Sequence, residues 1–114
     1  MPSEGARFEN MVASHLLKWC HYHEDVFGIN VGLFYARDRQ KREVDFLIAW
    51  EGKPWMLVEC KLTEDRAYSS LAYFGAALDV TSRYLVSLRS TSDYKGRRTS
   101  VRVIPVAKFL MGFS

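Results

Sequence analysis

The spacing of apolar residues along the chain predicts three helices. Apolar side chains recur every three or four residues over residues 4–22, which is the period of an amphipathic helix, and Ser3 is placed to cap its first turn. A second helix is predicted over residues 64–78 after Thr63, and a short third helix over residues 106–111. The predicted buried stripe of the first helix consists of Phe8, Met11, Val12, His15, Leu16 and Trp19. That of the second consists of Ala67, Leu71, Phe74 and Leu78.

Short apolar and aromatic runs predict five strands, over residues 32–37, 43–50, 55–62, 83–88 and 101–104. The polar run RDRQKR joins the first two strands as a hairpin tip, and the short turn EGKP joins the second to the third. The segments HEDVFGIN and RSTSDYKGRRTS are expected to be loops, the second of them mobile. Three strands in a meander, then a helix and a further strand, predict one mixed sheet flanked by helices.

Three charged residues, Asp45, Glu59 and Lys61, interrupt the second and third strands, where charge is costly to bury. Side chains alternate along a strand, so Glu59 and Lys61 share a face. With a three-residue turn centred on Gly52, the cross-strand pairs are Trp50–Pro54, Ile48–Met56 and Asp45–Glu59. A shifted turn would instead place Asp45 opposite Cys60.

Two carboxylates that face each other across neighbouring strands repel, and a divalent cation bound by both removes that repulsion. Lys61 lies one step along the same face, and Glu9 of the first helix is a fourth candidate. These groups suit metal-assisted hydrolysis of a phosphodiester, with Mg²⁺ or Mn²⁺ as cofactor. The competing interpretation is a buried salt bridge, in which Lys61 neutralises Asp45 or Glu59. Two acids and one base would leave that arrangement with excess negative charge, so we favour the site.

Length and charge bear on the number of domains, the kind of partner and the cellular location. The 114 residues suit one domain, and a composition that is 48% hydrophobic allows a true core. The net charge of +3 is compatible with a nucleic-acid partner. Candidate phosphate contacts are Arg37, Arg39, Lys41, Arg42, Lys95, Arg97 and Arg98, although solvated loops would look the same. With no signal peptide and no membrane-length apolar run, we expect a cytoplasmic protein without a membrane partner.

The order Asp45, then Glu59-Cys60-Lys61 after a short hairpin, with Glu9 on a preceding helix, resembles the PD-(D/E)XK nuclease superfamily. That superfamily has a restriction-endonuclease-like fold of the α/β class, whose α-β-β-β-α-β core agrees with the predicted order. The strings RFENMVASHLLK, FYARDRQKREVDFLIAW and LVECKL are similar to the nuclease-like C-terminal domain of predicted prokaryotic AAA-type ATPases. Val44 stands where the name-giving proline would be.

The resemblance implies that Asp45 and Glu59 are metal ligands and that Lys61 is the catalytic lysine. Glu9 would be a supporting acid or ligand, and the carbonyl of Cys60 would also contact the metal. The implied activity is that of a DNA endonuclease-like enzyme, within a single domain spanning residues 1–114.

Two alternatives remain open for a chain that lacks the phosphate-binding pattern GxxxxGK[ST]. The first is a catalytically silent nucleic-acid-binding or regulatory module of a larger ATPase, since a fold does not fix a function. The second is a self-associating domain, in which the aromatic residues form a homo-oligomer interface. The resemblance makes an ATPase domain missing from this chain an expected partner, and the chain is then either free-standing or a C-terminal piece.

Overall fold

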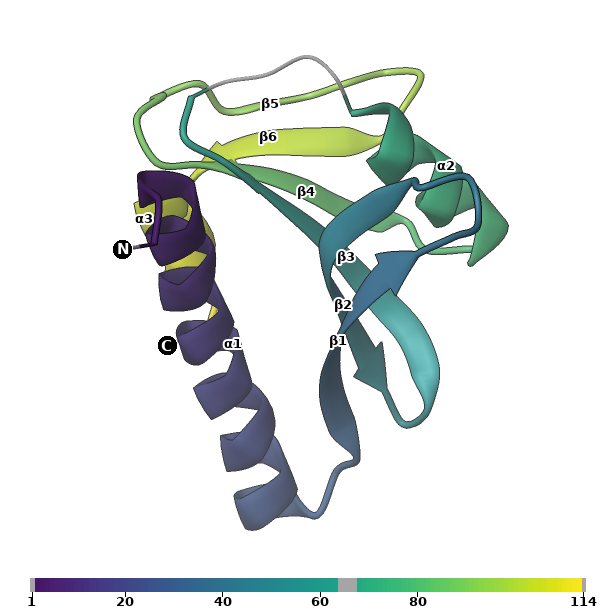
Figure 1. Ribbon diagram of the computed structural model, residues 1–114. Helices are drawn as coiled ribbons and strands as arrows, with labels where there is room; N and C mark the ends of the chain where they lie inside the picture. Colours follow the sequence, from purple (N-terminus) through teal and green to yellow (C-terminus); the bar gives the residue numbers. More distant parts are fainter. Residues whose placement is uncertain (1, 64–67, 114) are drawn as a thin grey trace.

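A six-stranded mixed sheet lies between helices in the computed structural model, which describes residues 2–63 and 68–113 (Figure 1). The strand order is β1-β2-β3-β4-β6-β5. The elements are α1 (Glu4–Phe27), β1 (Val31–Arg37), β2 (Glu43–Trp50), β3 (Lys53–Lys61), α2 (Ser69–Ala77), β4 (Ser82–Ser87), β5 (Tyr94–Lys95), β6 (Val101–Pro105) and α3 (Val106–Met111). β1, β2 and β3 pair antiparallel, whereas β3, β4 and β6 pair parallel. The predicted mixed α/β sheet is confirmed, with β5 as an additional strand inside the expected loop.

Helix α1 begins as predicted and ends later than predicted. The Ser3 hydroxyl accepts a hydrogen bond from the N–H of Ala6 at 3.1 Å, which confirms the cap. The helix continues to Phe27, so the prediction of a loop from residue 23 is wrong. Gly28 ends it with φ of 67°, a left-handed conformation that glycine adopts without strain. Within the described residues, no helix has the length and apolar character needed to cross a membrane.

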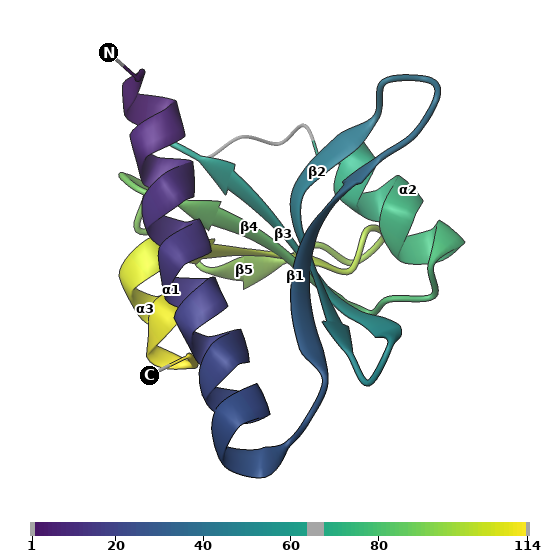
Figure 2. The ribbon, with the colours of Figure 1, turned by 60° about the horizontal axis from the view of Figure 1, so that its bottom comes forward.

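The two faces of the sheet carry separate cores. Helices α1 and α3 lie on one side of the sheet and α2 on the other (Figure 2). Phe8, Val12 and Leu16 of α1 are buried as predicted, whereas Met11 is 43% exposed. The core on the α2 face contains Leu71 and Phe74, also as predicted, but Leu78 is exposed. The predicted helix start at residue 64 and the predicted burial of Ala67 fall outside the described residues.

The turn between β2 and β3 is tighter than predicted. Only Glu51 and Gly52 form it, both with positive φ (52° and 78°), and Trp50 pairs with Lys53 rather than with Pro54. The register then shifts by one residue, because Ala49 pairs with Pro54 and Ile48 with Met56. This bulge in β3 restores the predicted register from Met56 onward.

Candidate active site

Asp45 lies in a second bulge, in β2. Phe34 of β1 pairs with Leu47, but Ala36 pairs with Val44, so β2 has one more residue than β1 over this stretch. As a result, Val44 and Leu47 enter the same core although they are three residues apart. A bulge of this kind redirects the side chains within it and interrupts the ladder of backbone hydrogen bonds. Within this bulge, the Asp45 carboxylate contacts the backbone of β3.

The Asp45 carboxylate is held by the neighbouring strand. The backbone N–H of Cys60 donates to Oδ2 of Asp45 at 2.8 Å. The last backbone pair between the strands is Phe46 with Val58, and the same register places Asp45 opposite Glu59. The predicted juxtaposition of the two acids is therefore present, although a two-residue turn and a bulge produce it in place of a three-residue turn.

Asp45 is the centre of a cluster of carboxyl groups. Both Glu59 of β3 and Glu9 of α1 interact with Asp45 by a side-chain hydrogen bond. This hydrogen bond and the charge of Asp45 both favour the protonated forms of the two glutamates. The Lys61 ammonium is close enough to act electrostatically on both Glu9 and Glu59.

Burial and negative charge together raise the pKa values of Glu59 and Glu9. Burial raises the pKa of Glu59 to about 8, and the hydrogen bond and charge of Asp45 act in the same direction. Burial is also the main cause of a raised pKa of Glu9, followed by the charge of Asp45. The positive charge of Lys61 opposes both shifts without cancelling them. Three acids and one base therefore share a site in which full ionisation costs free energy.

Cys60 is buried beside this cluster, with 6% of its surface exposed. Burial raises the pKa of its thiol, and the charges of Asp45, Glu9 and Glu59 raise it further. The side chain is thus a neutral thiol rather than a thiolate ligand. Its backbone N–H fixes Asp45, which is a role that the sequence did not suggest. The predicted metal contact of its carbonyl oxygen stays a prediction.

The carboxyl groups suit a hard divalent cation. Among the described residues, no group of three His, Cys, Asp or Glu side chains forms a ready-made metal cage. Mg²⁺ does not require one, because it is usually held by one or two carboxylates, with water and substrate phosphate completing the octahedron. Asp45 and Glu59 provide two such carboxyl groups in direct contact. Two adjacent carboxyl groups supply the oxygen ligands that such a cation prefers, so the residues fit the metal.

The seven predicted phosphate contacts lie in two separate places. Arg37, Arg39, Lys41 and Arg42 surround the β1–β2 hairpin tip, next to one edge strand of the sheet. Lys95, Arg97 and Arg98 are exposed in and after β5, the other edge strand. Since β1 and β5 are the two outermost strands, the structure does not bring the two basic runs together along the sheet.

The segment that contains β5 is attached by an ion-pair network that sequence reasoning missed. Asp93 accepts hydrogen bonds from Arg102 of β6 and from Lys108 of α3. These bonds lower the pKa of Asp93 to about 2. The polar run around Asp93 gives no signal for such an attachment, because the same residues are typical of a solvated loop.

Comparison with known proteins gives one family. A family model described as a domain of unknown function, DUF4143, matches residues 4–109. The chain belongs to the DUF4143 family. No curated protein and no solved structure matches it. All four clustered residues of this DUF4143 domain, which are Glu9, Asp45, Glu59 and Lys61, lie within the matched region.

Proposed function

We propose that this DUF4143 domain is a Mg²⁺- or Mn²⁺-dependent nuclease of the PD-(D/E)XK type, which hydrolyses phosphodiester bonds in DNA. The observation that carries the proposal is the contact of Asp45 with both Glu59 and Glu9 beside Lys61. Such a concentration of partly buried acids is unfavourable in a purely structural protein, and perturbed carboxyl groups are common at catalytic sites. The observed element order also supports a restriction-endonuclease-like fold.

The four side chains have distinct roles in this proposal. Asp45 and Glu59 would hold the metal, which when bound would polarise the phosphate and acidify a water molecule. The Cys60 N–H keeps the Asp45 carboxylate directed toward β3. The Lys61 ammonium donates hydrogen bonds to a phosphate oxygen and stabilises the negative charge that develops there. Burial and the charge of Asp45 raise the pKa of Glu9, so Glu9 holds a proton more readily than an ordinary glutamate.

The direct test is cleavage of supercoiled plasmid DNA with Mg²⁺ or Mn²⁺. We expect Asp45→Ala and Lys61→Ala each to lower the cleavage rate by about 100-fold or more, which is typical for loss of a group that stabilises the transition state. Matched controls are Asp25→Ala on the exposed side of α1 and Lys53→Ala at the β2–β3 turn, which should cleave at the wild-type rate. Equal cleavage by all five proteins would point to a contaminating nuclease and contradict the proposal.

Titration calorimetry separates the nuclease from the silent module. A nuclease site should bind Mn²⁺ in the wild type and lose that binding in Asp45→Ala. DNA binding that persists without any metal affinity would instead favour a nucleic-acid-binding or regulatory module.

A further inference from the structure

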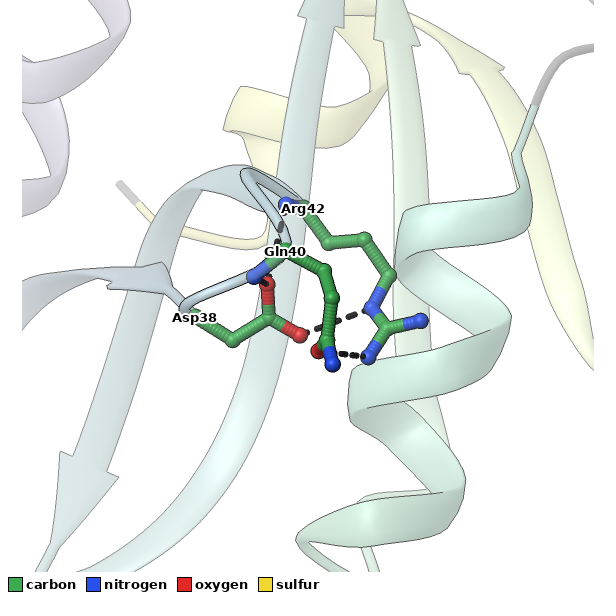
Figure 3. Close-up of polar contacts among 3 residues, drawn as sticks. All are labelled: Asp38, Gln40 and Arg42. Carbon is green, nitrogen blue, oxygen red and sulfur yellow. Dashed lines mark hydrogen bonds and ion pairs between the residues drawn. The ribbon is translucent and has the colours of Figure 1, made fainter.

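The tip of the β1–β2 hairpin is built around Asp38 (Figure 3). Oδ1 of Asp38 accepts hydrogen bonds from the backbone N–H groups of Gln40 and Arg42, each at 3.0 Å. The backbone N–H of Asp38 donates to the carbonyl of Arg42 at 3.0 Å and closes the loop. Lys41 adopts the left-handed conformation, with φ of 63°. The tip therefore has a defined conformation although it is polar and exposed.

The Arg42 side chain is engaged on three sides. Its Nε donates to Oδ2 of Asp38 at 2.7 Å, and a terminal nitrogen donates to Oε1 of Gln40 at 2.8 Å. Its guanidinium carbon lies 3.5 Å from the ring centroid of Tyr73. Tyr73 belongs to α2, so Arg42 fastens the hairpin tip to a helix from another part of the chain.

Arg39 and Lys41 differ from Arg42 because both side chains are exposed at the tip. Lys41 also lines a hollow of about 460 Å³ together with Arg37, Asp38 and Glu43. Glu43 lies on β2 only two residues before Asp45, about 7 Å along the strand, so this hollow lies near the acidic cluster. A phosphate chain bound at the cluster would thus find the exposed cations of the hairpin tip close by.

We propose that Arg42 is a positioning residue, whose attachment to Asp38 and Tyr73 fixes the hairpin so that Arg39 and Lys41 contact the phosphate backbone of DNA at the acidic cluster. This proposal rests on the proposed nuclease function. It gives Arg42 a different role from Arg39 and Lys41, with which the sequence alone had grouped it. It also adds Tyr73 of α2 as the anchor of the arrangement.

Salt dependence of DNA binding distinguishes a phosphate contact from a positioning residue. Binding of a fluorescently labelled duplex is measured by anisotropy across a range of salt concentrations, without divalent metal, so that cleavage plays no part. Each lost phosphate contact should reduce the slope of log affinity against log salt by about 0.9. We expect that reduction for Arg39→Gln and for Lys41→Asn, since asparagine tolerates the left-handed conformation of Lys41. Lys53→Gln at the opposite end of β2 and β3 is the matched control.

Variants of the anchor should behave differently. Tyr73→Leu keeps the net charge, so we expect affinity to fall by about three- to tenfold with an unchanged slope, because a loosened hairpin must be ordered on binding. Arg42→Lys keeps the charge but loses the planar contacts, and should give the same result. Tyr73→Phe retains the ring and should bind DNA with wild-type affinity. Tyr73 is 41% exposed, so these variants should fold, and circular dichroism checks that they do.

Three outcomes would overturn the assignment. If Arg42→Gln lowers the slope as much as Arg39→Gln does, while Tyr73→Leu has no effect, Arg42 is itself a phosphate contact. If the duplex binds but neither Arg39→Gln nor Lys41→Asn changes the slope, the hairpin tip is not the contact surface, and the cleavage assay still decides the nuclease proposal. If the wild type neither binds nor cleaves DNA, both proposals are wrong.

Discussion

The two ends of the β2–β3 hairpin have opposite chemistry. At the turn end, Trp50 and Trp55 pack with Trp19 of α1, and the ring centroids of the three tryptophans lie 5.7–6.0 Å apart. These are all the tryptophans of the chain. At the open end, the register of the strands places Asp45 opposite Glu59, beside Lys61. The same two strands thus carry an aromatic cluster at one end and a group of charges at the other.

Helix α1 contributes to both regions. The aromatic end stabilises the fold, and the charged end is the proposed catalytic site. Trp19 contributes to the aromatic end and Glu9 to the charged end, ten residues or about 15 Å apart along the helix. Burial of indole rings is favourable, whereas burial of carboxyl groups costs free energy. The aromatic end offsets the free-energy cost of the charged end. Changes at the aromatic end should therefore mainly lower stability, whereas changes at the charged end should mainly lower activity.

The largest expected change in stability is at the aromatic end. Trp19→Ala should lower the free energy of unfolding by about 3 kcal/mol, because it removes the ring that the other two tryptophans contact. Urea denaturation measures this loss. Tyr22→Ala, an exposed aromatic residue on the same helix, should change stability by less than about 0.5 kcal/mol. Equal losses in the two variants would mean that the tryptophan cluster contributes no more to stability than an exposed aromatic residue does.

Metal should raise the free energy of unfolding only when the charged end is intact. At a concentration of Mn²⁺ one hundred times its dissociation constant, the free energy of unfolding of the wild type should rise by about 2.7 kcal/mol. Asp45→Asn should abolish the rise in melting temperature, whereas Trp55→Phe at the other end should retain it. Thermal denaturation with and without Mn²⁺ tests this, and an unchanged rise in Asp45→Asn would show that the cation binds elsewhere.

Stability without metal should fall as pH rises. The pKa of Glu59 is about 8 in the folded protein against an ordinary value of 4.5. Between these values the folded state binds more protons than the unfolded state, so each increase in pH favours unfolding. Glu59→Gln should flatten the profile between about pH 4.5 and 8, while Glu24→Gln on exposed α1 should leave it unchanged. Urea denaturation at a series of pH values measures this dependence. A free energy of unfolding of the wild type that does not change with pH would contradict the assigned burial of Glu59.

The smallest expected effect concerns the turn that sets the register of both ends. Gly52→Ala should destabilise by about 1–2 kcal/mol, because φ of 78° is strained for any residue with a Cβ. Gly5→Ala, in the regular first turn of α1, should instead stabilise by about 1 kcal/mol or less. Urea denaturation of both variants measures the contrast, and destabilisation by Gly5→Ala would show that backbone conformation does not control these effects.

Much of this arrangement follows from the sequence, but the reasons differ from element to element. Strand β2 has the predicted bounds because charged and turn residues delimit an apolar run. The end of α1 was mispredicted because the polar residues of HEDVF suggest a loop, whereas they lie on its exposed side and Gly28 is the true stop signal. Strand β5 was missed because Tyr94 and Lys95 are both exposed and owe their strand conformation to pairing with β6.

The pairing of Asp45 with Glu59 was predicted for a fortuitous reason. A three-residue turn and a two-residue turn followed by a bulge give the same register beyond Met56, so the pairing of Asp45 with Glu59 did not depend on the error. The bulge around Asp45 has no sequence signature, because it arises from mismatch with β1. The contact of Arg42 with Tyr73 depends on where α2 packs, which local patterns do not specify.

The mixed pairing of the sheet has a consequence for the chain during translation. β3 is paired by β2 as soon as residues 43–61 have emerged, but its other edge waits for β4, which follows only after the α2 crossover. In that interval an apolar strand presents open backbone groups, which is the condition for aggregation. Glu59 and Lys61 lie on that strand, and we expect their charges to discourage its pairing with a second nascent chain. The residues proposed for catalysis would then also protect the protein before it is complete.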